Sequence, residues 1–144
     1  MNYIIIDTSS MLFGLRYNKN IFELIKTKYL SNYKIIISKG ILNELTYLSK
    51  YNSELALNAK AAIQIINSLT QTQSKVFIYE KSSINVDSWI LRASRKFDNS
   101  IIITNDTKLA EELKKIKDKE SKETENKTTK IYKLSKQGIL RQFY

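Results

Sequence analysis

Four carboxylates in this 144-residue chain occupy positions at which acidic side chains could work together. Asp7 directly follows the apolar run YIII, and Asp106 directly follows the run IIITN. Glu44 lies inside the helix-like pattern ILNELTYL, and Asp87 belongs to the helix-like stretch VDSWILRASRKF. Acidic side chains that gather in one place repel one another unless a cation neutralises them. Such a group is therefore typical of a site for a metal ion.

The chain as a whole is strongly basic, with 24 lysines and arginines against 14 aspartates and glutamates and a formal net charge of +10. This balance suits nucleic-acid binding, because lysines and arginines neutralise phosphates and release condensed counterions. Charge alone would also fit a chain that is merely rich in lysine, isoleucine and asparagine. Together with an acidic site, it indicates a metal ion and a polyanionic substrate, which is the pairing that a metal-dependent nuclease requires.

Cysteine and histidine are both absent from the sequence. Their absence excludes disulfides, thiolate nucleophiles, histidine-based zinc sites and any catalytic dyad or triad that needs a histidine. A bound metal would have carboxylate, carbonyl and water oxygens as its ligands, and these favour Mg²⁺ or Mn²⁺. We therefore expect one of these two ions as the cofactor.

Each carboxylate also has a purely structural interpretation, which the sequence leaves open. Asp7 and Asp106 could each cap the helix that follows, since aspartate is a good N-cap residue. Asp87 could be a first-turn acid that the helix dipole favours. Glu44 borders the apolar face of its helix and could form a salt bridge with a lysine. The metal-site hypothesis is preferred because it explains all four positions together.

Short apolar runs alternate with amphipathic helical patterns, which predicts an α/β fold. The predicted strands are residues 3–6, 35–37, 76–79 and 101–103, with 131–132 as a candidate fifth strand. Residues 7–10 indicate a turn or the start of a helix, and later helices are predicted within 21–30, 41–48, 55–69, 86–97 and 109–116. Continuous apolar strands are typical of a parallel sheet with both faces covered. We expect a three-layer α/β/α sandwich around a mainly parallel sheet of four to five strands.

The length predicts one domain with a substantial core. We assign residues 1–134 to this domain, with a flexible charged loop at 117–130, and residues 135–144 to a basic C-terminal tail without an assigned role. The N-terminus lacks the features of a secretory signal, and no apolar run approaches the roughly 18 residues of a membrane span. We therefore expect a cytoplasmic protein that does not associate with membranes.

The order of four segments, IIIDTSS, ISKGILNEL, NVDSWILRAS and IIITNDTKLAEEL, resembles the PIN domain family. The resemblance covers roughly residues 2–117 and is closest to compact archaeal-type proteins, which are similar to VapC toxins and to nucleases that trim pre-ribosomal RNA. It implies one or two divalent ions held by four catalytic acids, Asp7, Glu44, Asp87 and Asp106. It also implies contacts beside the metal site from Thr8, Ser9, Thr104 and Asn105.

Basic side chains near the acidic positions could hold the RNA strand. Arg92, Arg95 and Lys96 lie on the helix that begins near Asp87, largely opposite its apolar stripe. Lys108 lies two positions after the last of the four acids. These four side chains are candidates for phosphate contacts, and an ordinary solvated helix face is the alternative.

These observations predict a metal-dependent endoribonuclease that hydrolyses phosphodiester bonds of RNA. The resemblance implies a homodimer, ribosomal or transfer RNA as substrate, and an antitoxin or a pre-ribosomal particle as partner. A non-catalytic RNA-binding or ribosome-assembly factor with the same fold is the alternative. Receiver domains, haloacid-dehalogenase-like phosphotransferases and dinucleotide-binding folds are disfavoured, because their acidic pairs or glycine-rich loops are missing.

Overall fold

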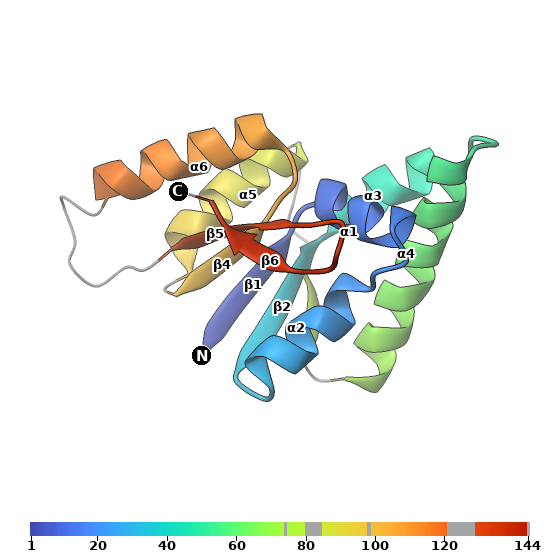
Figure 1. The fold of residues 1–144 in the computed structure, drawn as a ribbon, viewed down its shortest axis with the longest axis horizontal. Helices are drawn as coiled ribbons and strands as arrows, with labels where there is room; N and C mark the ends of the chain where they lie inside the picture. The colour runs from blue at the N-terminus through green and yellow to red at the C-terminus, as the bar shows by residue number, and fades with distance from the viewer. Residues whose placement is uncertain (74, 80–84, 98, 121–128, 144) are drawn as a thin grey trace.

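The computed structural model describes residues 1–73, 75–79, 85–97, 99–120 and 129–143 (Figure 1). The strands in these ranges are β1 (Asn2–Ile6), β2 (Tyr33–Ser38), β3 (Val76–Tyr79), β4 (Ser100–Ile103), β5 (Lys130–Leu134) and β6 (Leu140–Gln142). The helices are α1 (Thr8–Arg16), α2 (Ile21–Tyr29), α3 (Lys39–Leu48), α4 (Glu54–Thr72), α5 (Val86–Lys96) and α6 (Thr107–Glu120). No helix in the described ranges is long and apolar enough to cross a lipid bilayer.

The described strands form one sheet in the order β3-β2-β1-β4-β5-β6. Strands β1 to β5 run parallel to one another, and β6 is antiparallel to β5. In the centre of the sheet, Ile6 of β1 is paired with Ile103 of β4. The residues that follow these two strands therefore lie side by side. The arrangement confirms the predicted α/β class and mainly parallel sheet.

Two hydrophobic cores lie on opposite faces of the sheet, because successive side chains of a strand point to opposite faces. On one face, Ile4 and Ile6 belong to a core that includes buried residues of α1 to α4. On the other face, Ile5 packs with a core that includes Trp89 of α5 and Leu113 of α6. Figure 1 shows α5 and α6 together on one side of the sheet. The result is the expected three-layer sandwich.

Helix α1 is longer than the turn or helix start predicted over residues 7–10. Its sequence TSSMLFGLR contains two serines, a threonine and a glycine, which are weak helix formers, so its helicity depends on packing. Gly14 permits that packing: a Cβ there would lie 2.8 Å from the backbone oxygen of Lys19 and 3.0 Å from Cδ2 of Leu134. Close tertiary contact therefore holds α1 in place.

The charged segment after the fourth strand differs from the prediction. The sequence predicts a loop over 117–130, but residues 117–120 form the last turn of α6, and β5 begins at Lys130. Residues 121–128 lie outside the described residues. Glu120 in this last turn lies 3.4 Å from Arg95 of α5, so an ion pair between the two helices supports the end of α6.

The C-terminal residues also differ from the predicted tail. Residues 140–142 form β6, which pairs with β5 through the register Leu134 opposite Leu140. A turn containing Gly138, with a φ of 82°, connects the two strands. The segment therefore belongs to the sheet. A three-residue strand is too short to produce an apolar pattern in the sequence.

Candidate active site at the carboxyl edge of the sheet

Asp7 lies at the end of β1, in the centre of the sheet, and is only 5% exposed. Its backbone N–H donates to the carbonyl oxygen of Ile103 at 2.9 Å. Its carboxylate oxygen Oδ2 accepts hydrogen bonds from Ser9 Oγ at 2.6 Å and from Thr104 Oγ1 at 2.9 Å. Asp7 stands at the N-cap position of α1, but its side chain makes no capping hydrogen bond. Side-chain hydroxyl groups, and not the backbone N–H groups of α1, therefore bind this carboxylate.

The hydroxyls of Ser9 and Thr104 join the ends of β1 and β4. Thr104 Oγ1 accepts a hydrogen bond from the N–H of Asp106 at 3.1 Å, and Ser9 Oγ accepts one from the N–H of Asn105 at 3.0 Å. The two hydroxyl oxygens are 3.4 Å apart. The same two groups that bind the Asp7 carboxylate thus also bind the backbone that carries Asp106.

Asp106 is half-buried and acts as a helix cap. Its Oδ1 accepts hydrogen bonds from the N–H groups of Lys108 at 3.0 Å and Leu109 at 3.2 Å. The capping interpretation is therefore confirmed for Asp106. A carboxylate offers about four lone-pair positions, so the cap leaves capacity for a further ligand.

Glu44 comes to the same edge of the sheet from α3. Its Oε2 accepts a hydrogen bond from Thr8 Oγ1 at 3.3 Å. Burial raises the pKa of this carboxyl above 4.5, the charges of Asp7 and Asp87 raise it further, and the Thr8 hydrogen bond opposes them. The residue as a whole is exposed, so this desolvation is partial. Within the described ranges, the salt bridge to a lysine that the sequence leaves open is absent.

Asp87 lies in the first turn of α5, where Asn85 provides the cap by accepting the N–H of Ser88 at 2.8 Å. Partial burial raises the pKa of Asp87, and the charges of Asp7 and Asp106 raise it further. A carboxyl feels such charges strongly only when they are close. The charges of Asp7 and Asp87 thus act on Glu44, and those of Asp7 and Asp106 act on Asp87, although these residues are far apart in the sequence.

Glu112 also belongs to this group of charges, although the sequence analysis does not single it out. Its charge raises the pKa of Asp87, and the charge of Lys108 lowers it. Lys108 and Glu112 are four residues apart on α6 and therefore lie on the same helix face. That spacing is the sequence signal from which Glu112 could have been identified.

The chemistry of these side chains fits a hard divalent cation, since the donors are carboxylate oxygens and burial together with neighbouring acidic charges raises the pKa of Glu44 and of Asp87. The type of ligand atom fits such an ion, whereas the arrangement of the described side chains does not form a binding cluster. Among the residues that the structure describes, no group of three or more acids is arranged as a metal-binding cluster.

Asn105 connects parts of the fold next to the acids. Its Oδ1 accepts hydrogen bonds from Ser10 Oγ at 2.8 Å and from the N–H of Leu134 at 3.1 Å. Its Nδ2 donates to the carbonyl oxygen of Leu134 at 2.9 Å. Ser10, which the sequence analysis does not name, is fully buried in this contact. Asn105 therefore ties α1 to β5.

The four candidate basic residues have different surroundings. Lys108 acts directly on the acids through its effect on the pKa of Asp87. Arg92 is exposed on α5. Arg95 Nε lies 3.4 Å from Glu120 Oε1. Lys96 Nζ donates to the hydroxyl of Tyr79 at 3.0 Å and lies over its ring. Lys108 is thus the basic side chain most directly associated with the candidate site.

Comparison with known proteins identifies solved structures with a similar fold and a matching family. The chain matches a solved structure of the PIN domain endonuclease Utp24 with a TM-score of 0.69 and 18% identity, over 97% of this chain and 90% of the other. It matches a domain of a functionally unknown protein from Methanocaldococcus jannaschii DSM 2661 with a TM-score of 0.60 and 22% identity, over 81% of this chain and 86% of the other. A search of curated proteins finds no match. A family model described as a PIN like domain matches residues 4–120, and the chain therefore belongs to the PIN-like domain family.

Proposed function

We propose that this protein is a metal-dependent endoribonuclease that hydrolyses phosphodiester bonds of RNA. One observation carries the proposal: burial and the charge of Asp7 raise the pKa of both Glu44 and Asp87, and the charge of Asp106 also raises that of Asp87. Groups with such perturbed pKa values cluster at functional sites. Membership of the PIN-like family and the fold shared with a PIN domain endonuclease support the same function.

The proposed ligands of one or two Mg²⁺ or Mn²⁺ ions are Asp7, Glu44, Asp87 and Asp106. When bound, such an ion lowers the pKa of a water molecule and offsets the charge that develops on phosphate oxygens. The hydroxyls of Ser9 and Thr104 orient the buried Asp7 carboxylate by donating to the same oxygen. Thr8 orients the Glu44 carboxylate in the same way.

The RNA strand needs cations of the protein beside the acids. Lys108 is the proposed contact for the phosphate next to the cleaved bond, because its charge already acts on Asp87. Arg92 is exposed and extends the proposed contacts along α5. Arg95 and Lys96 would contact phosphates by leaving Glu120 and Tyr79, their present neighbours.

Two biological roles fit this activity, ribosomal RNA processing and a VapC-type toxin. Co-purification with pre-ribosomal particles would support the first role. A gene for a small antitoxin next to the gene for this protein would support the second. In both cases we propose a cytoplasmic protein that forms a homodimer. Sedimentation equilibrium of the purified protein measures its molar mass and so tests the dimer.

The decisive experiment measures cleavage of labelled single-stranded RNA with Mg²⁺ or Mn²⁺ and with EDTA. We expect cleavage only with the divalent ion. We expect Asp7→Asn and Asp106→Asn each to reduce the rate about 100-fold or more, as is typical when one group that stabilises developing charge is removed. Asp118→Asn is the matched control, because it lies 12 residues after Asp106 along α6, about 18 Å away along the helix axis.

The alternative, a non-catalytic RNA-binding or assembly factor, predicts a different outcome of the same experiment. Such a protein would bind RNA with or without the divalent ion and would cleave none of the substrates. Equal rates for the wild type, Asp7→Asn and Asp118→Asn would also contradict the proposal, because the cleavage would then come from a contaminant.

A further inference from the structure

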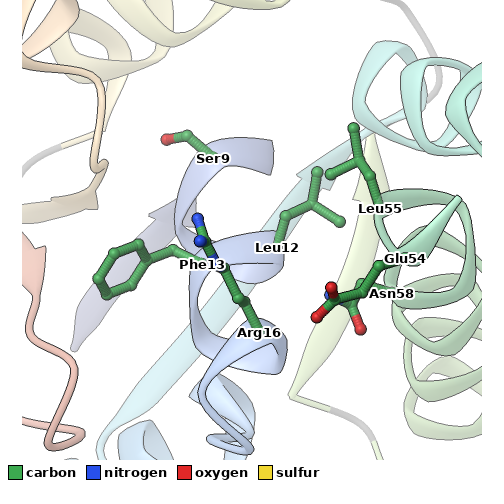
Figure 2. A pocket seen from close by; sticks show the side chains of 7 residues that line it. All are labelled: Ser9, Leu12, Phe13, Arg16, Glu54, Leu55 and Asn58. Carbon is green, nitrogen blue, oxygen red and sulfur yellow. The ribbon is translucent and has the colours of Figure 1, made fainter.

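A pocket of about 440 Å³ lies between α1 and the first turns of α4 (Figure 2). Its side chains from α1 are Ser9, Leu12, Phe13 and Arg16, and those from α4 are Glu54, Leu55 and Asn58. Figure 2 shows the α4 residues across from Ser9 and Phe13, with Leu12 between them. Ser9 also donates a hydrogen bond to Asp7, one of the four acids.

The pocket adjoins the acidic site through α1. Ser9 lines the pocket, and its Oγ donates to Asp7 Oδ2 at 2.6 Å. The preceding residue, Thr8, donates to Glu44. Helix α1 therefore contacts the acids through its first turn and forms one wall of the pocket through residues along its whole length. A nucleic-acid strand with a phosphate at Asp7 would bring its neighbouring nucleotide to this opening.

We infer that this pocket binds an unpaired nucleobase of the RNA strand, next to the phosphate at the acidic site. This inference rests on the proposed ribonuclease function and adds a subsite to it. The volume falls within the range of small-ligand pockets, roughly 300–1,000 Å³. Leu12, Phe13 and Leu55 supply apolar and aromatic surface for the faces of a base, as in other proteins that bind single-stranded RNA.

The polar side chains of the pocket indicate which bases it prefers. The carboxylate of Glu54 can only accept hydrogen bonds, so it favours a base with an exocyclic amino group, such as cytosine. It disfavours uracil, which has carbonyl oxygens in place of that group. Arg16 on the opposite helix is suited to a flanking phosphate, because its guanidinium forms bidentate contacts with phosphate oxygens.

The test measures binding by fluorescence anisotropy with short labelled oligocytidylate and oligouridylate in EDTA, so that no cleavage occurs. We expect tighter binding of oligocytidylate. Leu55→Glu should weaken it about 10-fold or more, because the change replaces apolar surface beside the base with a carboxylate. Leu57→Glu is the control, because it adds the same charge two residues away, at a side chain that is 65% exposed and outside the pocket.

A second variant tests the base preference separately from the affinity. Glu54→Gln should reduce the ratio of oligocytidylate to oligouridylate affinity, because an amide can also donate to the uracil carbonyls. Equal affinities of Leu55→Glu and Leu57→Glu, with both folded by circular dichroism, would overturn the inference. An unchanged ratio in Glu54→Gln would overturn the proposed preference for amino-bearing bases.

Parallel cleavage assays separate this inference from the function on which it rests. If the wild type cleaves RNA and Leu55→Glu binds like Leu57→Glu, the nuclease proposal stands and the pocket inference fails. If RNA binding depends on Leu55 but no cleavage occurs with Mg²⁺ or Mn²⁺, the pocket inference stands and the nuclease proposal fails.

Discussion

Asp7 and Asp106 follow neighbouring strands and precede helices, yet their carboxylates have different partners. Asp106 Oδ1 caps α6, and Asp7 Oδ2 instead accepts the hydroxyls of Ser9 and Thr104. The general preference of aspartate for the N-cap position predicts the same capping role for both residues, since each precedes a helix. The difference arises from Thr104, which parallel pairing of β1 and β4 brings to Asp7.

The raised pKa of Glu44 predicts a measurable stability effect. A carboxyl whose pKa is higher in the folded protein than in the unfolded chain destabilises the fold when it is ionised. This cost is absent well below pH 4.5 and grows as the pH rises through and above that value. In EDTA near neutral pH, Glu44→Gln should therefore raise the free energy of unfolding by about 0.5 kcal/mol, a small value because the residue is exposed.

Urea unfolding at several pH values measures this effect. The exposed glutamate Glu111 provides the control, since Glu111→Gln removes one charge from α6 without touching the proposed ligands. Mg²⁺ should stabilise the wild type more than Glu44→Gln. A variant that is less stable than the wild type in EDTA near neutral pH would contradict the electrostatic account of Glu44.

Helix α1 is the element on which the candidate site depends most. It carries Thr8 and Ser9, which bind the carboxylates of Glu44 and Asp7. Its own sequence is a weak helix former, so its position depends on tertiary contacts. Asn105 provides three such hydrogen bonds, to Ser10 and to the backbone of Leu134, and so fixes α1 against β5.

Asn105→Ala should lower the free energy of unfolding by about 1–3 kcal/mol, because it leaves buried polar groups of Leu134 and Ser10 without a partner. Thermal or urea unfolding gives the value directly. Asn43→Ala, at an exposed position of α3, removes the same amide and should leave stability nearly unchanged. If the two variants have equal stability, Asn105 does not hold the two elements together.

The whole molecule combines a net charge of +10 with acids gathered at one edge of its sheet. A net positive charge of this size favours association with a polyanion, whereas carboxylates that face a phosphate repel it unless a cation neutralises them. The C-terminal end of α2 lies toward the opposite, amino edge of the sheet, because β2, which follows it, runs from that edge toward the acids in parallel with β1.

This charge distribution predicts a position-dependent salt effect on RNA binding. Binding of Asp7→Asn to single-stranded RNA should weaken as KCl rises, with a slope of about −0.7 per neutralised phosphate in a double-logarithmic plot. Adding Lys108→Ala should weaken binding and reduce that slope by about 0.7. Adding Lys26→Ala at the end of α2, toward the amino edge, should change it little. Equal slopes for the two lysine variants would exclude a phosphate contact by Lys108.

The sequence by itself determined the class of the fold and the chemistry available to it. Runs of isoleucine are stable in water mainly when they are buried. Their alternation with amphipathic helices predicted the parallel sheet and the helical layers on both of its faces. The absence of histidine and cysteine limited any metal site to oxygen ligands. Asp7 and Asp106 each follow a predicted strand. In a parallel sheet both residues must therefore lie at the carboxyl edge.

Only the tertiary structure decided which side chains meet. The hydroxyl contacts of Asp7, the joining of α1 to β5 by Asn105, the charge of Glu112 beside Asp87 and the pairing of β6 all connect residues that are distant in the chain or lack a periodic pattern. Local preferences depend on near neighbours in the sequence. These contacts depend instead on strand order and on the close approach at Gly14, which exist only once the chain has packed.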